Sequence, residues 1–213
     1  MTTKTSLTLA FLLIALALAA GLLLSSQLPD PMPSHWNAAG EIDGYTSKAL
    51  GIWLLPLMTA GLTLLLALIP LLDPLRANID KFRPLYNLFI IGFVIYMLYV
   101  YALTLASALG WQFNMSVMLL PVMGLLFIGI SFLLKNAKRN FFIGIRTPWT
   151  LSSDSVWEKT HALGAKTFLA GGLAILLSAF LGENGLWLML IALMIAAFVP
   201  IVYSYILWRQ ENS

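Results

Sequence analysis

The sequence PLYNLFIIGFVIYMLYVYALTLASALGWQFNMSVMLLPVMGLLFIGISFLL, residues 84–134, contains no charged side chain. At about 1.5 Å per residue, one helix of this length would extend for roughly 75 Å. That is more than twice the roughly 30 Å of hydrocarbon in a bilayer. The stretch must therefore fold back once. GWQFN, residues 110–114, is the predicted turn, because Gly110 can end a helix and Trp111 suits a membrane interface.

Composition indicates a membrane environment for the whole chain of 213 residues. Hydrophobic residues make up 60% of the chain and charged residues 10%, whereas a soluble domain usually carries about 25% charged residues. The chain has no cysteine, which excludes disulfides and thiol chemistry. It also lacks a basic soluble region interleaved with aromatic residues, so no direct binding of nucleic acid is expected. We therefore predict a single integral membrane domain over residues 1–213.

Charged residues divide the chain into segments that each fit one crossing of the bilayer. A membrane helix needs roughly 20 apolar residues. The first segment is longer than the apolar part of a signal peptide, so a membrane helix is favoured over a cleaved leader. The fold class is therefore predicted to be all-α and polytopic, with six transmembrane helices at about 6–26, 49–71, 86–109, 115–134, 164–181 and 186–207.

The distribution of basic residues predicts the orientation, because lysine and arginine concentrate in the cytoplasmic loops of membrane proteins. If the N-terminus is inside, Lys48 alone faces outward. The other basic residues then lie on the cytoplasmic side: Lys4, Arg76, Lys81, Arg83, Lys135, Lys138, Arg139, Arg146, Lys159, Lys166 and Arg209. We therefore expect a multi-pass protein of the cell membrane with both termini in the cytoplasm, an extracytoplasmic loop at 27–48 and a cytoplasmic loop at 135–163.

The polar content of the predicted helices is mostly hydroxyls, such as those of Thr59 and Thr63, together with Asn87. Ion-coupled carriers commonly place carboxylates or histidines at membrane depth, so the absence of buried charge disfavours a transporter. A stripe of small residues in the fifth span predicts the close approach of another helix: Ala170, Ala174, Ser178 and Gly182.

The outer loop begins with LPDPMPSHWN, residues 28–37, in which three alternating prolines predict a stiff extended strip. Gly40 and the Asp43–Gly44 pair then predict two turns. A loop of this length is usually either functional or disordered, and its prolines and aromatic residues favour order. The loop is therefore predicted to be a structured element between the first two helices.

The polar side chains of the outer loop leave several uses open. His35, Glu41 and Asp43 could bind a metal or act as acids and bases, but zinc sites rarely combine one histidine with carboxylates alone. The other histidine, His161, is predicted on the opposite side of the membrane. A structural cap and a recognition surface for an extracellular ligand are the favoured alternatives.

The cytoplasmic segment KNAKRNFFIGIRTPWTLSSDSVWEKTHALGAK, residues 135–166, is basic in its first half, which suits a surface of anionic headgroups. Gly144 permits a close backbone approach, Arg146 is a rigid donor and Pro148 ends any helix. Ser155 and Glu158 fit a capping box. A short amphipathic helix at the membrane interface is therefore predicted before the fifth span.

Two side chains of that short helix attract attention. His161 follows Trp157 by one turn and is expected to be packed and hydrogen-bonded rather than reactive. Arg146 and Glu158 could form an ion pair. A membrane-embedded enzyme would have to use His161, Arg146 and Glu158 together, because catalytic partners need to lie near hydrogen-bonding reach.

Two motifs resemble those of the SdpI family of bacterial membrane proteins. LPDPMPSHWNAAGEIDGYTSK, residues 28–48, is similar to that family's proline-led His-Trp-Asn stretch, which continues to a glycine, an Asp-Gly-Tyr turn and a lysine. NFFIGIRTPWTLSSDSVWEKTHALGAK, residues 140–166, is similar to its Gly-Ile-Arg-Thr-Pro motif with a tryptophan and a histidine in the next helix. The two motifs occur in the family's order, and the pattern of spans extends the resemblance to nearly the whole chain.

The resemblance implies an immunity protein that protects its producer against the SdpC peptide toxin and signals by sequestering a cytoplasmic repressor at the membrane. Carried over by position, the residues expected to bind the extracellular ligand are His35, Trp36, Asn37, Gly40, Asp43, Tyr45 and Lys48. Those expected to bind the cytoplasmic partner are Asn140, Arg146, Thr147, Pro148, Trp149, Trp157 and His161.

The leading hypothesis from the sequence is therefore an SdpI-type immunity and receptor protein, without catalytic residues, metal or cofactor. Its expected partners are membrane lipid, an extracellular peptide toxin and a cytoplasmic repressor protein. The alternatives are a transporter of a small molecule or peptide, and an enzyme at the cytoplasmic interface. The sequence does not fix the oligomeric state.

Overall fold

The computed structural model describes residues 1–212, and most of them are helical. Six helices in that range are long and apolar enough to cross a membrane, as predicted. The elements follow in the order α1 (Thr3–Leu23), β1 (Met32–Trp36), β2 (Ile42–Thr46), α2 (Lys48–Leu72), α3 (Arg76–Asp80), α4 (Arg83–Ala108), α5 (Met115–Asn136), α6 (Pro148–Ser152), α7 (Asp154–Ser178), a 3₁₀ segment η1 (Ala179–Asn184) and α8 (Gly185–Glu211). The predicted all-α membrane fold is confirmed.

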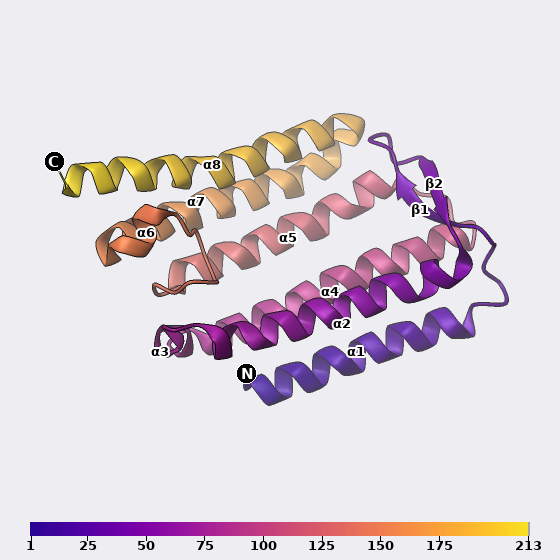
Figure 1. Cartoon of the computed structure of the whole chain (residues 1–213). Coiled ribbons are helices and arrows are strands. Elements are labelled where there is room, and N and C mark those ends of the chain that lie inside the picture. Colours follow the sequence, from indigo (N-terminus) through magenta and orange to yellow (C-terminus); the bar gives the residue numbers. More distant parts are fainter. Residues whose placement is uncertain (213) are drawn as a thin grey trace.

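The six long helices lie side by side, with the β1–β2 hairpin at one end and α3, α6 and both termini at the other (Figure 1). Hydrogen bonds agree with this arrangement. The side-chain amide of Asn87, in the first turns of α4, donates to the Met1 carbonyl at 3.1 Å, and the Ser153 hydroxyl donates to Glu211 at 2.9 Å. We call the two ends of the bundle the hairpin end and the terminal end; the loops 27–48 and 135–163 are therefore separated by the length of the helices.

The helices pack in two groups of three. One group, α1, α2 and α4, shares apolar clusters that include Ile14 and Val94. The other, α5, α7 and α8, packs around Leu120 and Ile175. A cluster at the terminal end joins them; its buried members are Ile79, Phe82, Tyr86, Ile90, Leu133, Ala137, Ile143 and Trp157. The loop 135–163 thus contributes directly to holding the two groups together.

The turn that was predicted at residues 110–114 is confirmed. α4 ends at Ala108, and Gly110 has φ +86°, a left-handed conformation that favours glycine. Asn114 caps α5, because its Oδ1 accepts a hydrogen bond from the Val117 N–H at 3.0 Å. The uncharged stretch from 84 to 134 therefore forms two antiparallel helices.

The predicted stripe of small residues is only partly right. Ala170 is exposed, and the close approaches in α7 are made by two adjacent glycines. A Cβ on Gly172 would lie 2.8 Å from the Gly124 carbonyl oxygen of α5, and one on Gly171 would lie 3.4 Å from the Ala192 carbonyl oxygen of α8. A four-residue period follows a single helix face, whereas α7 is packed between two partners and needs small residues on two faces.

The outer loop differs in detail from the sequence prediction. It forms an antiparallel hairpin, in which His35 pairs with Gly44 and Trp36 with Ile42. The turn that includes Gly40 is present, but the predicted turn at Asp43–Gly44 is wrong, because both residues lie inside β2. Gly44 is used for space instead: a Cβ there would lie 2.9 Å from the Cβ of His35.

The cytoplasmic loop also differs. Pro148 begins a helix rather than ending one, since it occupies the first position of α6, where its missing N–H costs nothing. A helix does begin near Ser155 as predicted, but it is not short, because α7 runs without a break from Asp154 into the fifth span. Its cap is Ser153, whose Oγ accepts from the Val156 N–H at 3.2 Å, and Asp154 in the first turn suits the helix dipole.

Candidate functional site

The hairpin closes through a turn that Asn37 and Glu41 hold from both sides. The Asn37 N–H donates to the Glu41 carbonyl at 2.9 Å, and the Glu41 N–H donates to the Asn37 side-chain oxygen at 3.0 Å. The Asn37 amide also donates to Glu41 Oε2 at 3.1 Å. Gly40, with φ +80°, supplies the left-handed residue that this turn requires. Asn37 and Gly40, both predicted as ligand-binding, thus shape the hairpin tip.

The hairpin tip is fixed to the start of α5. The Asn114 side-chain amide donates to the Ala39 carbonyl at 2.6 Å, while its oxygen caps α5. The Ser116 hydroxyl donates to the Asn37 carbonyl at 3.4 Å. A Cβ on Gly40 would collide with the Asn114 amide, so only glycine permits this contact. Asn114 therefore couples the hairpin to the α4–α5 turn, a role that its position in the predicted turn at 110–114 did not indicate.

The base of the hairpin is anchored in the helices. Met32 is fully buried among Leu28, Ile52 and Tyr101. At the start of α2, the Lys48 N–H donates to Asp30 Oδ1 at 3.1 Å, and the Lys48 ammonium donates to the Ser25 carbonyl at 3.2 Å. The polar contacts of Lys48 thus tie the two ends of the outer loop together.

The exposed face of the hairpin carries His35, Asp43 and Tyr45. The His35 Nδ1 and the Asp43 carboxylate form a close pair at 2.5 Å, and Tyr45 is 60% exposed. Glu41 is bonded to Asn37 instead, so His35, Glu41 and Asp43 do not converge as metal ligands. Among the described residues, no group of three or more histidine or acidic side chains could hold a metal.

A cleft of about 360 Å³ lies between the hairpin and the α4–α5 turn, beside the contact that Asn114 makes with the hairpin tip. Trp36, Glu41 and Ile42 line it from the hairpin, and Trp111, Gln112 and Phe113 line it from the turn. Trp111 is 71% exposed beside this opening. The cleft combines aromatic residues with one carboxylate and with polar groups, Ser107 and Gln112 among them. Trp36 was predicted to bind the ligand, whereas Trp111 was predicted only to lie at the membrane interface.

At the terminal end, the loop 135–163 folds around the fully buried side chain of Asn140. The Asn140 amide donates to the carbonyls of Lys138 and Ile143, each at 2.8 Å. Its oxygen accepts from the N–H groups of Phe142 at 2.9 Å and Ile143 at 2.5 Å. All four of these hydrogen bonds join the Asn140 side chain to backbone groups of the same loop. Asn140 therefore stabilises the loop from inside and is not exposed to a partner.

Two residues that were not predicted as functional, Asp73 and Asn78, connect this loop to the end of α2 and to α3. Asp73, nearly buried at the end of α2, accepts from the Leu75 N–H at 2.7 Å and from the Phe141 N–H at 2.8 Å. The Asn78 amide of α3 donates to the Arg139 carbonyl at 2.8 Å. The local signal was the Asp73–Pro74 pair, which is typical of a turn, but no local pattern could indicate its contact with Phe141.

His161 and Trp157 form the wall on which residues 143–145 rest. Their rings stack, with centroids 4.0 Å apart. The Ile145 N–H donates to His161 Nε2 at 3.0 Å, so Nδ1 carries the proton that is donated to the Trp157 carbonyl at 2.9 Å. The Trp157 indole N–H donates to the Ala137 carbonyl at 2.9 Å. The expectation of a packed, hydrogen-bonded histidine is confirmed.

The remaining predicted partner residues divide into buried and exposed members. Thr147 is buried, caps α6 and contacts the Ser204 hydroxyl of α8 at 3.1 Å. Trp149 is half-buried against Tyr205, with ring centroids 5.1 Å apart. Arg146 and Pro148 are exposed. The surface of the motif is therefore carried by Arg146, Pro148 and part of Trp149.

The three side chains considered for catalysis have separate partners. Arg146 donates to the Phe141 carbonyl at 3.0 Å, and both ring nitrogens of His161 are bonded to backbone. Glu158 pairs with Lys138 at 3.1 Å, so the considered Arg146–Glu158 ion pair is wrong. Arg146, His161 and Glu158 therefore bond other groups rather than one another, and they do not form the catalytic set that was considered.

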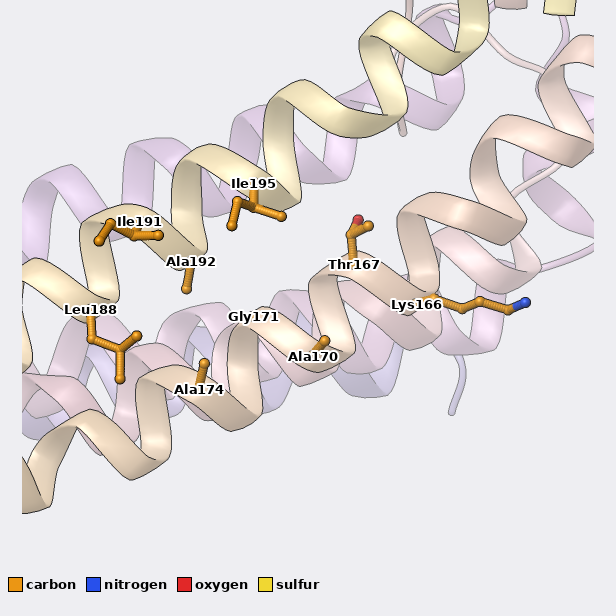
Figure 2. A pocket seen from close by; sticks show the side chains of 9 residues that line it. All are labelled: Lys166, Thr167, Ala170, Gly171, Ala174, Leu188, Ile191, Ala192 and Ile195. Atoms are coloured by element: carbon orange, nitrogen blue, oxygen red, sulfur yellow. The ribbon is translucent and has the colours of Figure 1, made fainter.

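An apolar pocket of about 440 Å³ opens between α7 and α8 (Figure 2). Small residues of α7 and aliphatic side chains of α8, among them Ala170, Ala174 and Ile191, form its walls. Lys166 lies at one end with its ammonium directed away from the pocket (Figure 2). Among the buried hydroxyls, Thr59 donates to the Leu55 carbonyl of its own helix at 2.7 Å, and Ser6 of α1 donates to the Asn87 carbonyl of α4 at 3.0 Å. These features lend no support to a polar transport path.

Both motif-bearing segments match the models of known protein families. Residues 136–204 match the SdpI/YfhL protein family, and residues 12–60 match a domain of unknown function, DUF1648. The chain is 23% identical over 206 residues to the immunity protein SdpI of Bacillus subtilis (strain 168), covering 96% of this chain and 97% of that protein. No solved structure matches. The resemblance to the SdpI family is confirmed.

Proposed function

We propose that this SdpI-type membrane protein confers resistance to a toxin-like antimicrobial peptide, which the hairpin end binds, and that the terminal end docks a cytoplasmic repressor. The observation that carries this proposal is the placement of the two family motifs. Each motif is built as an ordered structure, and the two lie at opposite ends of one helix bundle (Figure 1). A protein that receives a signal on one side of a membrane and reports it on the other needs this separation.

The orientation belongs to the proposal and rests on charge. Of the basic residues, Lys48 alone lies at the hairpin end, whereas eleven lie toward the terminal end. Such a bias favours the cytoplasm for the terminal end. The hairpin then faces the medium from which a peptide toxin arrives.

The hairpin is suited to binding because its shape is fixed before a ligand arrives. Asn114 holds its tip, Met32 fills its base, and Asp30 and Lys48 join its ends. A preorganised loop loses little conformational entropy on binding, which favours affinity. The residues left free by this framework are Trp36, the His35–Asp43 pair and Tyr45.

The terminal end is suited to docking for a similar reason. Asn140, Asp73 and His161 fix the backbone from 139 to 146 through hydrogen bonds. On this frame Phe141 and Phe142 are exposed by 46% and 38%, and Arg146 is exposed beside them. Exposed aromatic and arginine side chains on a rigid frame are typical of protein-binding surfaces.

The test is survival of a toxin-sensitive bacterium that expresses the chain and is challenged with the SdpC peptide toxin. We expect expression to raise survival, and we expect Trp36→Ala and His35→Ala to remove most of the gain. Trp187→Ala is the matched control, because Trp187 is 67% exposed at the start of α8 and does not line the cleft. Unchanged survival with the wild-type chain, at verified membrane levels, would overturn the proposal.

A further inference from the structure

The hairpin end carries an unbalanced negative charge. The loop 27–48 contains Asp30, Glu41 and Asp43 against Lys48 alone. Asp30 accepts from the Lys48 backbone, and Asp43 pairs with His35, so both of these carboxylates have a partner within the loop. Within the part of the chain that the structure describes, Glu41 and Asp30 each accept a hydrogen bond from a neutral N–H group only, and of these two carboxylates Glu41 is the one that lines the cleft.

Glu41 is also the carboxylate that faces the cleft. Asn37 donates to Oε2, which orients the carboxylate and leaves Oε1 without a hydrogen bond among the described residues. The walls beside it are aromatic: Trp36 on the hairpin, and Trp111 and Phe113 on the α4–α5 turn. A carboxylate beside tryptophan side chains can attract a cation, since the negative charge favours it and an indole ring can add a cation–π contact.

The position of the cleft suggests what carries that cation. It lies where the apolar helices end, and Ile42 and the exposed Trp111 extend an apolar surface around it. A ligand that combines a cationic side chain with apolar neighbours could therefore place its cation at Glu41 and its apolar side chains against Trp111 at the membrane interface.

We propose that the cleft formed by Trp36, Glu41, Trp111 and Phe113 is the binding site for a cationic amphipathic peptide, with the Glu41 carboxylate receiving a lysine or arginine side chain. This inference rests on the proposed function and specifies the chemistry of its extracellular ligand. Glu41, Trp111 and Phe113 lie outside the residues that the family motif suggested as ligand-binding.

The experiment uses the full chain in nanodiscs of zwitterionic lipid, so that a cationic probe is not drawn to the bilayer by charge. The probe is a fluorescein-labelled helical peptide of lysine and leucine, compared with the same peptide carrying glutamate in place of lysine. Binding is followed by fluorescence anisotropy, with empty nanodiscs subtracted. We expect saturable binding of the lysine peptide and at least tenfold weaker binding of the glutamate peptide.

Variants then locate the site. Glu41→Gln should weaken binding of the lysine peptide about tenfold, and Trp111→Ala about fivefold. Asp30→Asn is the charge-matched control in the same loop, because its remaining side-chain oxygen can still accept the Lys48 N–H, and Trp187→Ala is the aromatic control at the same end of the bundle. Both controls should retain affinity within about twofold, because neither residue lines the cleft.

Three outcomes overturn the inference: no saturable binding, equal binding of both peptides, or equal losses in Glu41→Gln and Asp30→Asn. The last would mean attraction to a diffuse acidic surface. Failure here is distinguishable from failure of the proposed function. If the Glu41→Gln variant still protects cells, the cleft is not the binding site, but the proposed immunity function stands. If the peptide binds in the cleft but the wild-type chain does not protect cells, the immunity function is wrong, but the binding site stands.

Discussion

Gly144 lies directly against the imidazole of His161. A Cβ built on Gly144 would come within 2.4 Å of His161 Nε2, the atom that accepts the Ile145 N–H. Gly144 also has φ +116°, in the left-handed region that side chains disfavour. The glycine of the Gly-Ile-Arg-Thr-Pro motif is therefore required for two reasons at once: its backbone angle and the closeness of the ring.

The first expectation follows from this contact. Gly144→Ala should destabilise the protein by about 1–3 kcal/mol through strain and should also displace the Ile145–His161 hydrogen bond. For a chain of this size that corresponds to a fall in Tm of roughly 3–10 °C. Gly110→Ala is the control, because Gly110 has φ +86° but nothing within 4 Å of its Cβ position. Equal falls in Tm for the two purified variants would show that the His161 contact contributes nothing.

A second expectation concerns Asn140. Asn140→Ala removes four hydrogen bonds to backbone in a buried place, which should cost about 2–4 kcal/mol. Hydrogen exchange should also become faster at the N–H groups of Phe142 and Ile143. Asn136→Ala serves as the control, since the Asn136 amide bonds only the Phe132 carbonyl of its own helix. If both variants unfold at the same temperature, Asn140 is not the centre of the loop.

These two residues also show how far sequence reasoning reaches. The six spans and the turn at 110–114 were predictable, because apolar length and turn residues are local properties of the chain. That Gly144 permits a close approach was predictable in kind, but its neighbour His161 lies in another element. The bond from Asp73 to the Phe141 N–H joins positions far apart in sequence, and no local pattern contains it.

The hairpin illustrates the same limit at shorter range. Asp43–Gly44 is a common turn pair, and sequence reasoning placed a turn there. The actual turn lies at 37–41, because Asn37 and Glu41 bond each other's backbone and Asn114 receives the tip. Gly44 lies in β2 instead, where the absence of a side chain leaves room for His35 on the paired strand. Of the two predicted turns, the one at Gly40 is present and is held by the contact of Asn114 with the Ala39 carbonyl, whereas the one at Asp43–Gly44 is absent.

A third expectation tests the helix crossing. Gly172→Ala should push α5 and α7 apart, because the new Cβ would lie 2.8 Å from the Gly124 carbonyl oxygen and a similar distance from Ile128. We expect about 1–3 kcal/mol of destabilisation from such overpacking. The adjacent Gly171→Ala meets Ala192 at 3.4 Å and should be close to neutral, since alanine also favours the helix. A neutral Gly172→Ala, read by thermal unfolding in detergent, would contradict this view of the α5–α7 interface.

The fourth expectation tests the orientation on which the proposed function depends. Because the chain contains no cysteine, single cysteines can be placed without background: Tyr45→Cys at the hairpin end and Phe141→Cys at the terminal end. A membrane-impermeant maleimide added to intact cells should label Tyr45→Cys, whereas Phe141→Cys should react only after permeabilisation. The physical reason is the crowding of basic residues at the terminal end, which favours retention on the cytoplasmic side. The unsubstituted chain is the control for specificity, and permeabilised cells show that both sites can react. Labelling of Phe141→Cys in intact cells, with Tyr45→Cys protected, would place the hairpin in the cytoplasm and remove it as a receptor for an external peptide.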